Sequence, residues 1–493
     1  MITVRIDEVA ETLIVAGVGE KPSSAALSGA RASVVGRITG GGKTWKATFG
    51  LRLARWGGAP LPLPSGEYEL ALKGLSAEEM RELRDIALPS TRAASLRVRI
   101  DESAAEPLGE GTVVHISSPL DPMLATPEGQ AVLEGRYAVQ EGGTENAVFF
   151  ESFYGQGSGC NPGAIDREIA AQAPSVTRYW GVTDLSVAVP EGAIAVVEGS
   201  AEWWHARAAA RLIVVNDWLR RRYVRKSGQT VLQTWHGTPL KRLALHRRGF
   251  HPRRMLAIVR ESRRWNVLLA QNLYAERVLR KAYAFSGRPV WVEGYPRNDA
   301  LVNGDGQAIR VALGIGSDEK VLLYAPTWRD DLTEMVDFID PEELARSTDA
   351  VVLVRGHSRT ITQGRDRAGA RIIDVTGYPD TAELLLAADA LITDYSSVMF
   401  DFSVTGKPMY FLVPDLERYR GQLRGFYFDL AERAPGPLVR TQDELVAALA
   451  DVDAIGGYAD RYVRWQRQFN RRDDGAAAER VVARILDQGY VTK

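Results

Sequence analysis

A histidine, a hydroxyl and a lysine stand close together in the segment Gln233 to Lys241, which reads QTWHGTPLK. The segment follows the strand-like run Thr230 to Leu232, and its glycine and proline predict a turn. Such a turn presents polar side chains to a ligand, and an imidazole exchanges a proton near neutral pH. The segment therefore predicts acid/base chemistry beside an anion, with His236 as the base. Taken singly, His236 is equally compatible with a structural, hydrogen-bonded role.

Three loops in the second half of the chain carry further groups suited to phosphate, and each follows a buried-type strand. They begin at Ala325, Arg355 and Thr393, and the third opens a helix with several hydroxyls. Hydroxyls and free N–H groups at a helix N-terminus form a cradle for phosphate. The candidate donor and phosphate ligands are Thr238, Arg297, Thr327, Arg329, Arg355, Thr393, Ser396, Ser397 and Asp401, and His357 is the second candidate catalytic residue.

Each of these residues also has a structural explanation when it is taken alone. Ser396 or Thr393 is more often a helix cap than a ligand, and a lone arginine such as Arg355 more often makes a salt bridge. His357 alone could be a hydrogen-bonded structural histidine. Their conjunction favours function, because ligands gather at the carboxyl ends of parallel strands.

The chain has a net charge of only −1, but its charges are unevenly distributed. Between Arg207 and Arg288 there are 20 Lys and Arg residues against three acidic residues. Such an excess favours a polyanionic partner or an anionic membrane surface over a solvated helix face. The aromatic interleaving of single-strand binders is missing, so nucleic acid is not expected as a partner. The candidate membrane or polymer contacts are Arg247, Arg248, Arg253, Arg254, Arg263 and Arg264.

The chain divides into three parts by its apolar pattern. Residues 1–140 contain short alternating runs, such as Ala32 to Ile38 and Ser95 to Ile100, which predicts a β-rich accessory domain. In residues 141–303, and again in 304–493, short apolar strands alternate with helical stretches. This pattern predicts two Rossmann-like α/β domains with doubly wound parallel sheets, whose strand-end loops surround a cleft. The predicted strands are Ala147 to Phe150, Ala193 to Val197, Arg211 to Val215, Val290 to Val292, Lys320 to Ala325, Ala350 to Val354, Arg371 to Val375, Ala390 to Thr393 and Pro408 to Leu412.

Length and composition exclude several other classes of protein and of binding site. With 493 residues, 45% of them hydrophobic and 25% charged, the chain has the composition of a soluble protein of about two to four domains. A single cysteine, Cys160, excludes an intrachain disulfide framework and a multi-cysteine zinc site. A secretory signal and an apolar run of roughly 20 residues are both missing, which favours the cytoplasm. Asp394 and Asp401 could help to bind Mg²⁺, but two carboxylates at this spacing are a weak metal signal, so magnesium stays undecided.

Five segments match a known family as a set. They are His236 to Lys241, Gly294 to Asp299, Tyr324 to Arg329, Arg355 to His357, and Thr393 to Asp401 with Lys407 and Pro408. Together they resemble the motifs of the CDP-glycerol glycerophosphotransferases, which extend teichoic acids and related polymers. The resemblance covers roughly Asn146 to Ala450, and the order of the motifs is the same. Ser358 stands where members of the family often have proline after the second motif histidine.

The resemblance implies two facing Rossmann-type domains, the GT-B arrangement, in a peripheral enzyme on the cytoplasmic face of the membrane. It implies transfer of glycerol phosphate, or a related alditol phosphate, from a CDP-activated donor to a hydroxyl of a lipid-linked acceptor. The acceptor would be a polyanionic teichoic-acid-like or capsular polymer, and CMP would be released. This reaction needs a base for the hydroxyl, which His236 suits, and cations around the phosphates. Arg329, Arg355 and His357 suit that second need.

Two other classes of function are left open by the residues. A nucleotide-sugar glycosyltransferase uses the same two-domain scaffold, because the fold alone does not set the chemistry. A non-catalytic protein that binds an anionic cell-surface polymer is favoured only if both histidines prove dispensable. Paired histidines at strand ends suit catalysis better than binding alone. The sequence does not distinguish a glycerol donor from a ribitol donor, or a primase from a polymerase.

Overall fold

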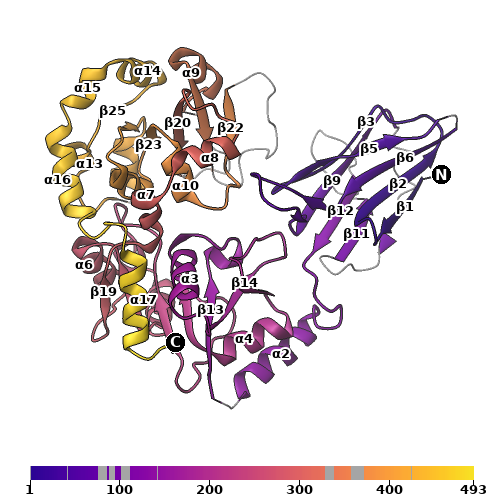
Figure 1. The fold of residues 1–493 in the computed structure, drawn as a ribbon, viewed down its shortest axis with the longest axis horizontal. Helices are drawn as coiled ribbons and strands as arrows, with labels where there is room; N and C mark the ends of the chain where they lie inside the picture. The colour runs from indigo at the N-terminus through magenta and orange to yellow at the C-terminus, as the bar shows by residue number, and fades with distance from the viewer. Residues whose placement is uncertain are drawn as a thin grey trace.

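The computed structural model describes residues 2–41, 43–75, 86–87, 95–100, 112–140, 143–327, 338–356, 371–423 and 425–493. They form an N-terminal β-sandwich and two α/β units, each with one parallel sheet (Figure 1). In this view the two α/β units lie one above the other, and the sandwich lies beside them. The predicted fold class, two Rossmann-like units after a β-rich part, is confirmed.

Two antiparallel sheets of the sandwich share one apolar core, to which β6 (Thr44–Gly50) contributes Trp45, Ala47 and Phe49. Their strand orders are β1-β2-β6-β5 and β10-β11-β12-β9-β3-β4. The other strands are β1 (Ile2–Asp7), β2 (Thr12–Val18), β3 (Ser24–Gly29), β4 (Ser33–Val35), β5 (Arg37–Thr39), β9 (Gly66–Lys73), β10 (Ile86–Ala87), β11 (Ser95–Ile100) and β12 (Thr112–Ser117), with a small hairpin of β7 (Arg52–Leu53) and β8 (Leu61–Pro62). The alternating run Ala32 to Ile38 is divided between the two sheets, as β4 and β5. It divides at Gly36, where a Cβ would lie 2.5 Å from the Phe49 ring.

The first α/β unit has a seven-stranded parallel sheet of order β15-β14-β13-β16-β17-β18-β19. Its strands are β13 (Glu145–Glu151), β14 (Thr177–Val182), β15 (Ile194–Val197), β16 (Ala210–Val215), β17 (Thr230–Gln233), β18 (Val267–Ala270) and β19 (Val290–Val292). Its helices are α2 (Pro127–Val139), α3 (Cys160–Gln172), α4 (Ala201–Ala209), α5 (Pro252–Ser262) and α6 (Leu273–Ala282). The strand order reverses between β13 and β16, and ligands of such sheets bind at that reversal.

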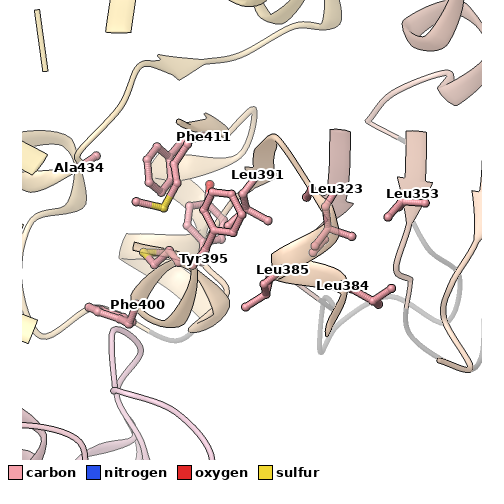
Figure 2. Close-up of a cluster of buried hydrophobic side chains, with 14 of the residues drawn as sticks. Leu323, Leu353, Leu384, Leu385, Leu391, Tyr395, Phe400, Phe411 and Ala434 are labelled. Atoms are coloured by element: carbon pink, nitrogen blue, oxygen red, sulfur yellow. The ribbon is translucent and has the colours of Figure 1, made fainter. Parts of the chain in front are cut away.

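The second α/β unit has a six-stranded parallel sheet of order β22-β21-β20-β23-β24-β25, which reverses between β20 and β23. Its strands are β20 (Lys320–Ala325), β21 (Ala350–Val354), β22 (Ile372–Asp374), β23 (Ala390–Thr393), β24 (Met409–Leu412) and β25 (Leu438–Val439). Its helices are α7 (Asp299–Asn303), α8 (Gly306–Ala312), α9 (Pro341–Thr348), α10 (Thr381–Ala387), α11 (Val398–Phe402), α12 (Leu416–Arg418), α13 (Leu430–Arg433), α14 (Gln442–Ala450), α15 (Val452–Gly456) and α16 (Ala459–Phe469). Leu323, Leu391 and Phe411 of the sheet share a core with Leu384 and Leu385 of α10 (Figure 2). This packing fixes α10 beside the ends of the strands.

Two helices pack across the domain boundaries that the sequence predicts at residues 140 and 303. The last helix, α17 (Ala477–Asp487), runs down onto the first unit, where Val481 and Ile485 join the core around Phe150 (Figure 1). Helix α2 likewise packs on the first unit, through Leu133 and Tyr137. The chain therefore crosses from the second α/β unit back to the first just before α17, and it ends on the first unit.

Candidate active site

A cleft of about 250 Å³ lies between the two α/β units, at the ends of their strands. In the second unit its wall includes Pro326, which follows β20, and Ser396, which comes after β23. Phe153, which comes after β13, lies in the wall on the opposite side. The cleft therefore lies where the strand order reverses in both sheets. Ligands of such folds bind at this position. The predicted site residues in its wall are His236, Arg297, Arg355, Ser396, Ser397 and Asp401.

The ring of His236 is held by the carbonyl group that follows β16. Nδ1 of His236 lies 2.6 Å from the carbonyl oxygen of Asn216. Because a carbonyl oxygen only accepts, Nδ1 carries the proton, and Nε2 is the unprotonated nitrogen of the neutral ring. Burial lowers the pKa of His236 below its ordinary value, and the nearby Asp217 carboxylate offsets this only in part. His236 is therefore neutral at neutral pH and has the form that a general base requires.

The turn that carries His236 touches the other unit directly. Trp235 has a φ of 55°, and its ring stacks on that of His236 at a centroid distance of 4.8 Å. A Cβ at Gly237 would lie 2.5 Å from Oγ of Ser397. The absence of a side chain at Gly237 therefore lets the histidine turn and the serine loop come together across the cleft.

An ion pair joins the two units at the floor of the cleft. Nη2 of Arg297 lies 2.7 Å from Oδ2 of Asp401, and the two side chains are only 13% and 7% exposed. Burial opposes the charge of Arg297, but Asp401 outweighs it and raises the pKa of Arg297 above its ordinary value. Oδ1 of Asp401 is buried and has no hydrogen-bond partner among the residues that the structure describes. The pair thus supplies a fixed cation and one unused acceptor.

Arg355 supplies a second cation to the cleft. Its Nη1 donates to the carbonyl oxygens of Val375 and Tyr378, each at 3.1 Å. Burial lowers the pKa of Arg355 to about 10, so the group is still charged at neutral pH. Both of these hydrogen bonds use Nη1, so within the described residues Nη2 and Nε are the donors through which Arg355 can bind a ligand.

Several residues predicted to bind the donor or its phosphates are not part of the cleft wall. The hydroxyl of Thr393 donates to the carbonyl oxygen of Ala325 at 2.7 Å, and that of Thr238 donates to Oε1 of Gln271 at 2.5 Å. Both threonines are fully buried, and neither is among the residues that line the cleft. The backbone N–H of Thr327 donates to Asp394, directly after the wall residue Pro326. His357, Ser358 and Arg329 lie outside the described residues.

The candidate carboxylates for Mg²⁺ are not grouped together. Oδ1 of Asp394 accepts the backbone N–H groups of Thr327 and Tyr395, which gives Asp394 a structural role, whereas Asp401 pairs with Arg297. In the described part of the chain, no group of three or more His, Cys, Asp or Glu residues is arranged to hold a metal ion.

A buried carboxylate behind the cleft connects the loops that carry His236 and Arg297. Asp473 accepts the backbone N–H of Tyr295 through Oδ1, at 3.0 Å, and the side-chain amide of Gln271 through Oδ2, at 2.8 Å. Gln271 in turn accepts the hydroxyl of Thr238, two residues after His236. Gly294, with a φ of 84°, has no room for a side chain, because a Cβ would lie 2.3 Å from the carbonyl oxygen of Arg472. The segment that leads into α17 therefore helps to position both loops.

The six arginines of the predicted basic surface differ in their contacts and in their exposure. Arg264 pairs with Glu261 at 2.9 Å, Arg254 donates to two carbonyl groups of its own loop, and Arg248 donates to the carbonyl oxygen of Gly421, so all three are partly used by the fold. The exposed members are Arg247, Arg248, Arg253 and Arg263. Part of the basic excess between Arg207 and Arg288 is thus structural, and the basic surface that remains is smaller than the sequence predicts.

Comparison with known proteins shows the family of this chain. A sequence model of the family described as CDP-Glycerol:Poly(glycerophosphate) glycerophosphotransferase matches residues 136–487. The chain belongs to this family. The resemblance seen in the five segments is thereby confirmed, and the β-sandwich lies before the part that the glycerophosphotransferase family shares.

Among relatives, the chain is 34% identical to the teichoic acid glycerol-phosphate transferase of Staphylococcus aureus (strain NCTC 8325 / PS 47), over 69% of this chain and 93% of that protein. It is 38% identical to the teichoic acid poly(glycerol phosphate) polymerase of Bacillus subtilis (strain 168), over 69% of this chain. It spans about half of that polymerase, 48% of its length. A solved structure of the wall teichoic acid polymerase TagF, a histidine variant with CDPG, matches with a TM-score of 0.68 and 31% identity. The match covers 73% of this chain and 94% of that one.

Four wall residues of this glycerophosphotransferase-family cleft lie outside the five predicted segments, namely Phe153, Thr381, Ala382 and Leu385. The ring of Phe153 lies 5.8 Å from that of His236, centroid to centroid, and covers one side of it. A glycine-rich loop after a first strand is the signal that could have found Phe153, since Gly155, Gly157 and Gly159 follow it. Thr381 is the first residue of α10 and gives no sequence signal of its own.

Proposed function

We propose that the protein transfers glycerol phosphate, or a related alditol phosphate, from a CDP-activated donor to a hydroxyl of a lipid-linked teichoic-acid-like or capsular acceptor, and releases CMP. The observation that carries the proposal is one cleft that holds a neutral histidine, His236, together with two buried cations, Arg297 and Arg355. Membership of the glycerophosphotransferase family, and relatives that are teichoic acid glycerol-phosphate transferases, support it.

The residues of the cleft suit the bonds that this reaction makes and breaks. The acceptor oxygen attacks phosphorus in line, and Nε2 of His236 takes the proton of its hydroxyl. The bond between phosphorus and the oxygen of the CMP phosphate breaks, and negative charge grows on that oxygen. Arg297 and Arg355, both in the cleft wall, offset this charge. Asp401, whose side chain is only 7% exposed, holds Arg297 in place at the cleft wall.

The proposal is tested with a panel of donors and the purified protein. The protein is incubated with a lipid-linked acceptor and, in turn, CDP-glycerol, CDP-ribitol or a UDP-sugar. The masses of the products are measured by mass spectrometry. We expect the acceptor to gain alditol phosphate units from a CDP-alditol, with one CMP released per unit. Transfer of a sugar from a UDP-sugar would establish the glycosyltransferase alternative instead. Polymer binding without any transfer would establish a binding protein.

We also propose that the protein binds peripherally to the cytoplasmic face of the membrane, where a lipid-linked acceptor lies. Helix α5 and the loop before it expose Phe250 and Leu256, at 79% and 69%, among the exposed arginines Arg248 and Arg253. Exposed apolar side chains mixed with cationic ones suit binding to anionic lipid. No helix of the described residues has the length and apolar character that crossing a bilayer requires.

Replacement of the four exposed arginines Arg247, Arg248, Arg253 and Arg263 by glutamine is expected to weaken binding to anionic liposomes. Each basic residue at such a surface contributes about 1 kcal/mol, so the affinity should fall at least 100-fold. Binding of the unchanged protein should also weaken as salt is raised. Flotation with anionic and neutral liposomes measures both effects.

The matched control removes the same charge at exposed sites elsewhere, by replacing Arg5, Arg37, Arg464 and Arg467 with glutamine. It should bind liposomes almost as well as the unchanged protein. Equal loss in both variants, or binding that does not depend on salt, would contradict the proposed surface.

A further inference from the structure

The β-sandwich touches both α/β units, although it lies outside the part of the chain that the family shares. On the first unit, Asp184 is buried and accepts Arg31 at 3.0 Å and the hydroxyl of Ser65 at 2.6 Å. On the second unit, the ring of Trp56 lies 5.3 Å from that of Tyr378, centroid to centroid. The sandwich therefore bridges the two units whose strand ends form the cleft.

The contact between Trp56 and Tyr378 lies close to the cleft, because Tyr378 is hydrogen-bonded to the wall residue Arg355. The carbonyl oxygen of Tyr378, against whose ring Trp56 packs, accepts Nη1 of Arg355. The hydroxyl of Tyr378 donates to Glu383 of α10 at 2.6 Å, and Thr381, at the start of α10, lines the cleft. Tyr378 thus connects Trp56 with two elements of the cleft wall.

The backbone at Trp56 has an unusual conformation. Trp56 lies in the segment that joins β7 to β8 and has a φ of 56°, a value that residues other than glycine rarely adopt. The neighbouring Arg55 donates to the carbonyl oxygen of Arg31 at 2.9 Å, and Arg31 is the residue that pairs with Asp184. A continuous series of contacts therefore runs from the first unit, through the sandwich, to Arg355 on the far side of the cleft.

We propose that Trp56 is a positioning residue for the donor site, which holds the loop of Val375 to Tyr378, and through it Arg355, in place at the cleft. The proposal rests on the proposed function in one respect, namely that Arg355 binds the phosphates of the donor. It gives the sandwich a specific task in transfer. A sandwich that served only as a tether would not couple Trp56 to Arg355.

The test compares the donor kinetics of Trp56→Ala, Trp56→Phe, Arg355→Gln and the double variant Trp56→Ala/Arg355→Gln in the full-length protein. Trp56→Ala should raise KM for CDP-glycerol about 3- to 10-fold, the effect of losing one aromatic contact, with a smaller change in kcat. Trp56→Phe keeps an aromatic ring and should stay within about 2-fold of the unchanged protein. The double variant should be no worse than Arg355→Gln alone, because both changes act through one guanidinium.

Leu53→Ala is the matched control, because Leu53 lies in the same hairpin but packs on the core of the sandwich. It should leave KM for the donor unchanged, and circular dichroism should show that every variant is folded. If Trp56→Ala keeps the normal KM, or its effect multiplies with that of Arg355→Gln, Trp56 does not position Arg355. If the unchanged protein uses no CDP-alditol at all, the proposed function fails instead, so the two failures are distinguishable.

Discussion

Replacement of His236 by alanine is expected to lower kcat for transfer from CDP-glycerol by about 10²- to 10⁴-fold, which is the usual contribution of a positioned base. The physical reason is that Nε2 is the only nitrogen of this ring without a proton, since Nδ1 donates to the carbonyl oxygen of Asn216. KM for the donor should change much less, because the cations Arg297 and Arg355 are untouched. Steady-state release of CMP measures both constants.

The dependence of the rate on pH gives a second measurement of the same role. Burial lowers the pKa of His236 below its ordinary value of about 6.5, so protonation of the ring requires a more acidic solution than usual. The base is therefore intact at neutral pH, and kcat/KM should fall only as the pH drops below about 6.5. This acidic limb should be missing from the profile of His236→Ala.

The control is His205→Ala, since the side chain of His205 is 58% exposed on α4, away from the cleft wall. It should transfer at the normal rate. A folded His236→Ala variant with nearly normal turnover would refute the role of His236 as the base.

Separate replacement of Arg297 by glutamine, or of Asp401 by asparagine, is expected to destabilise the protein by about 3–5 kcal/mol, because each leaves the other charge buried and unpaired. The double variant Arg297→Gln/Asp401→Asn removes both charges and should recover much of that stability. Transfer should remain impaired in all three, because the cation that offsets charge on the leaving phosphate is lost or displaced. Denaturant unfolding and release of CMP separate the two effects.

The matched control uses the exposed pair of Arg346 and Glu343, whose side chains are 69% and 47% exposed. Neutralising either partner of this pair should cost less than about 1 kcal/mol and leave transfer unchanged. If the double variant at Arg297 and Asp401 regains transfer along with stability, the pair only holds the units together and takes no part in the chemistry.

The strands and the motifs at their ends could be predicted from the sequence. The bounds of β19, β20, β21 and β23 agree with the predicted runs, because strands that are buried on both faces show as short apolar segments. Three strands escape this pattern, and one of them, β25, has only two residues. In β14 the apolar run is interrupted by Arg178, whose charge is buried against Asp166 of α3 at 2.8 Å. The four residues of β18 are simply too short a run to distinguish from a buried turn of helix.

Which hydroxyls face the cleft was decided only by the tertiary structure. Thr238 and Thr393 lie in the right motifs, yet their side chains turn inward to groups that are distant in sequence, Gln271 and Ala325. A buried hydroxyl needs a partner, and the nearest one here belongs to a neighbouring strand end rather than to a ligand. Position in a motif therefore predicted the loop but not the direction of each side chain.

The sequence by itself determined the family, the two parallel sheets and the histidine turn, because short-range patterns of apolar and polar residues encode strands and the loops that follow them. Only the tertiary structure decided that Arg297 pairs with Asp401 across the cleft, that Asp473 connects two loops from behind, and that Trp56 reaches Tyr378. These contacts join residues that are about 100 or more positions apart in the chain. No local pattern specifies such pairs, since their geometry depends on how whole sheets and helices pack against each other.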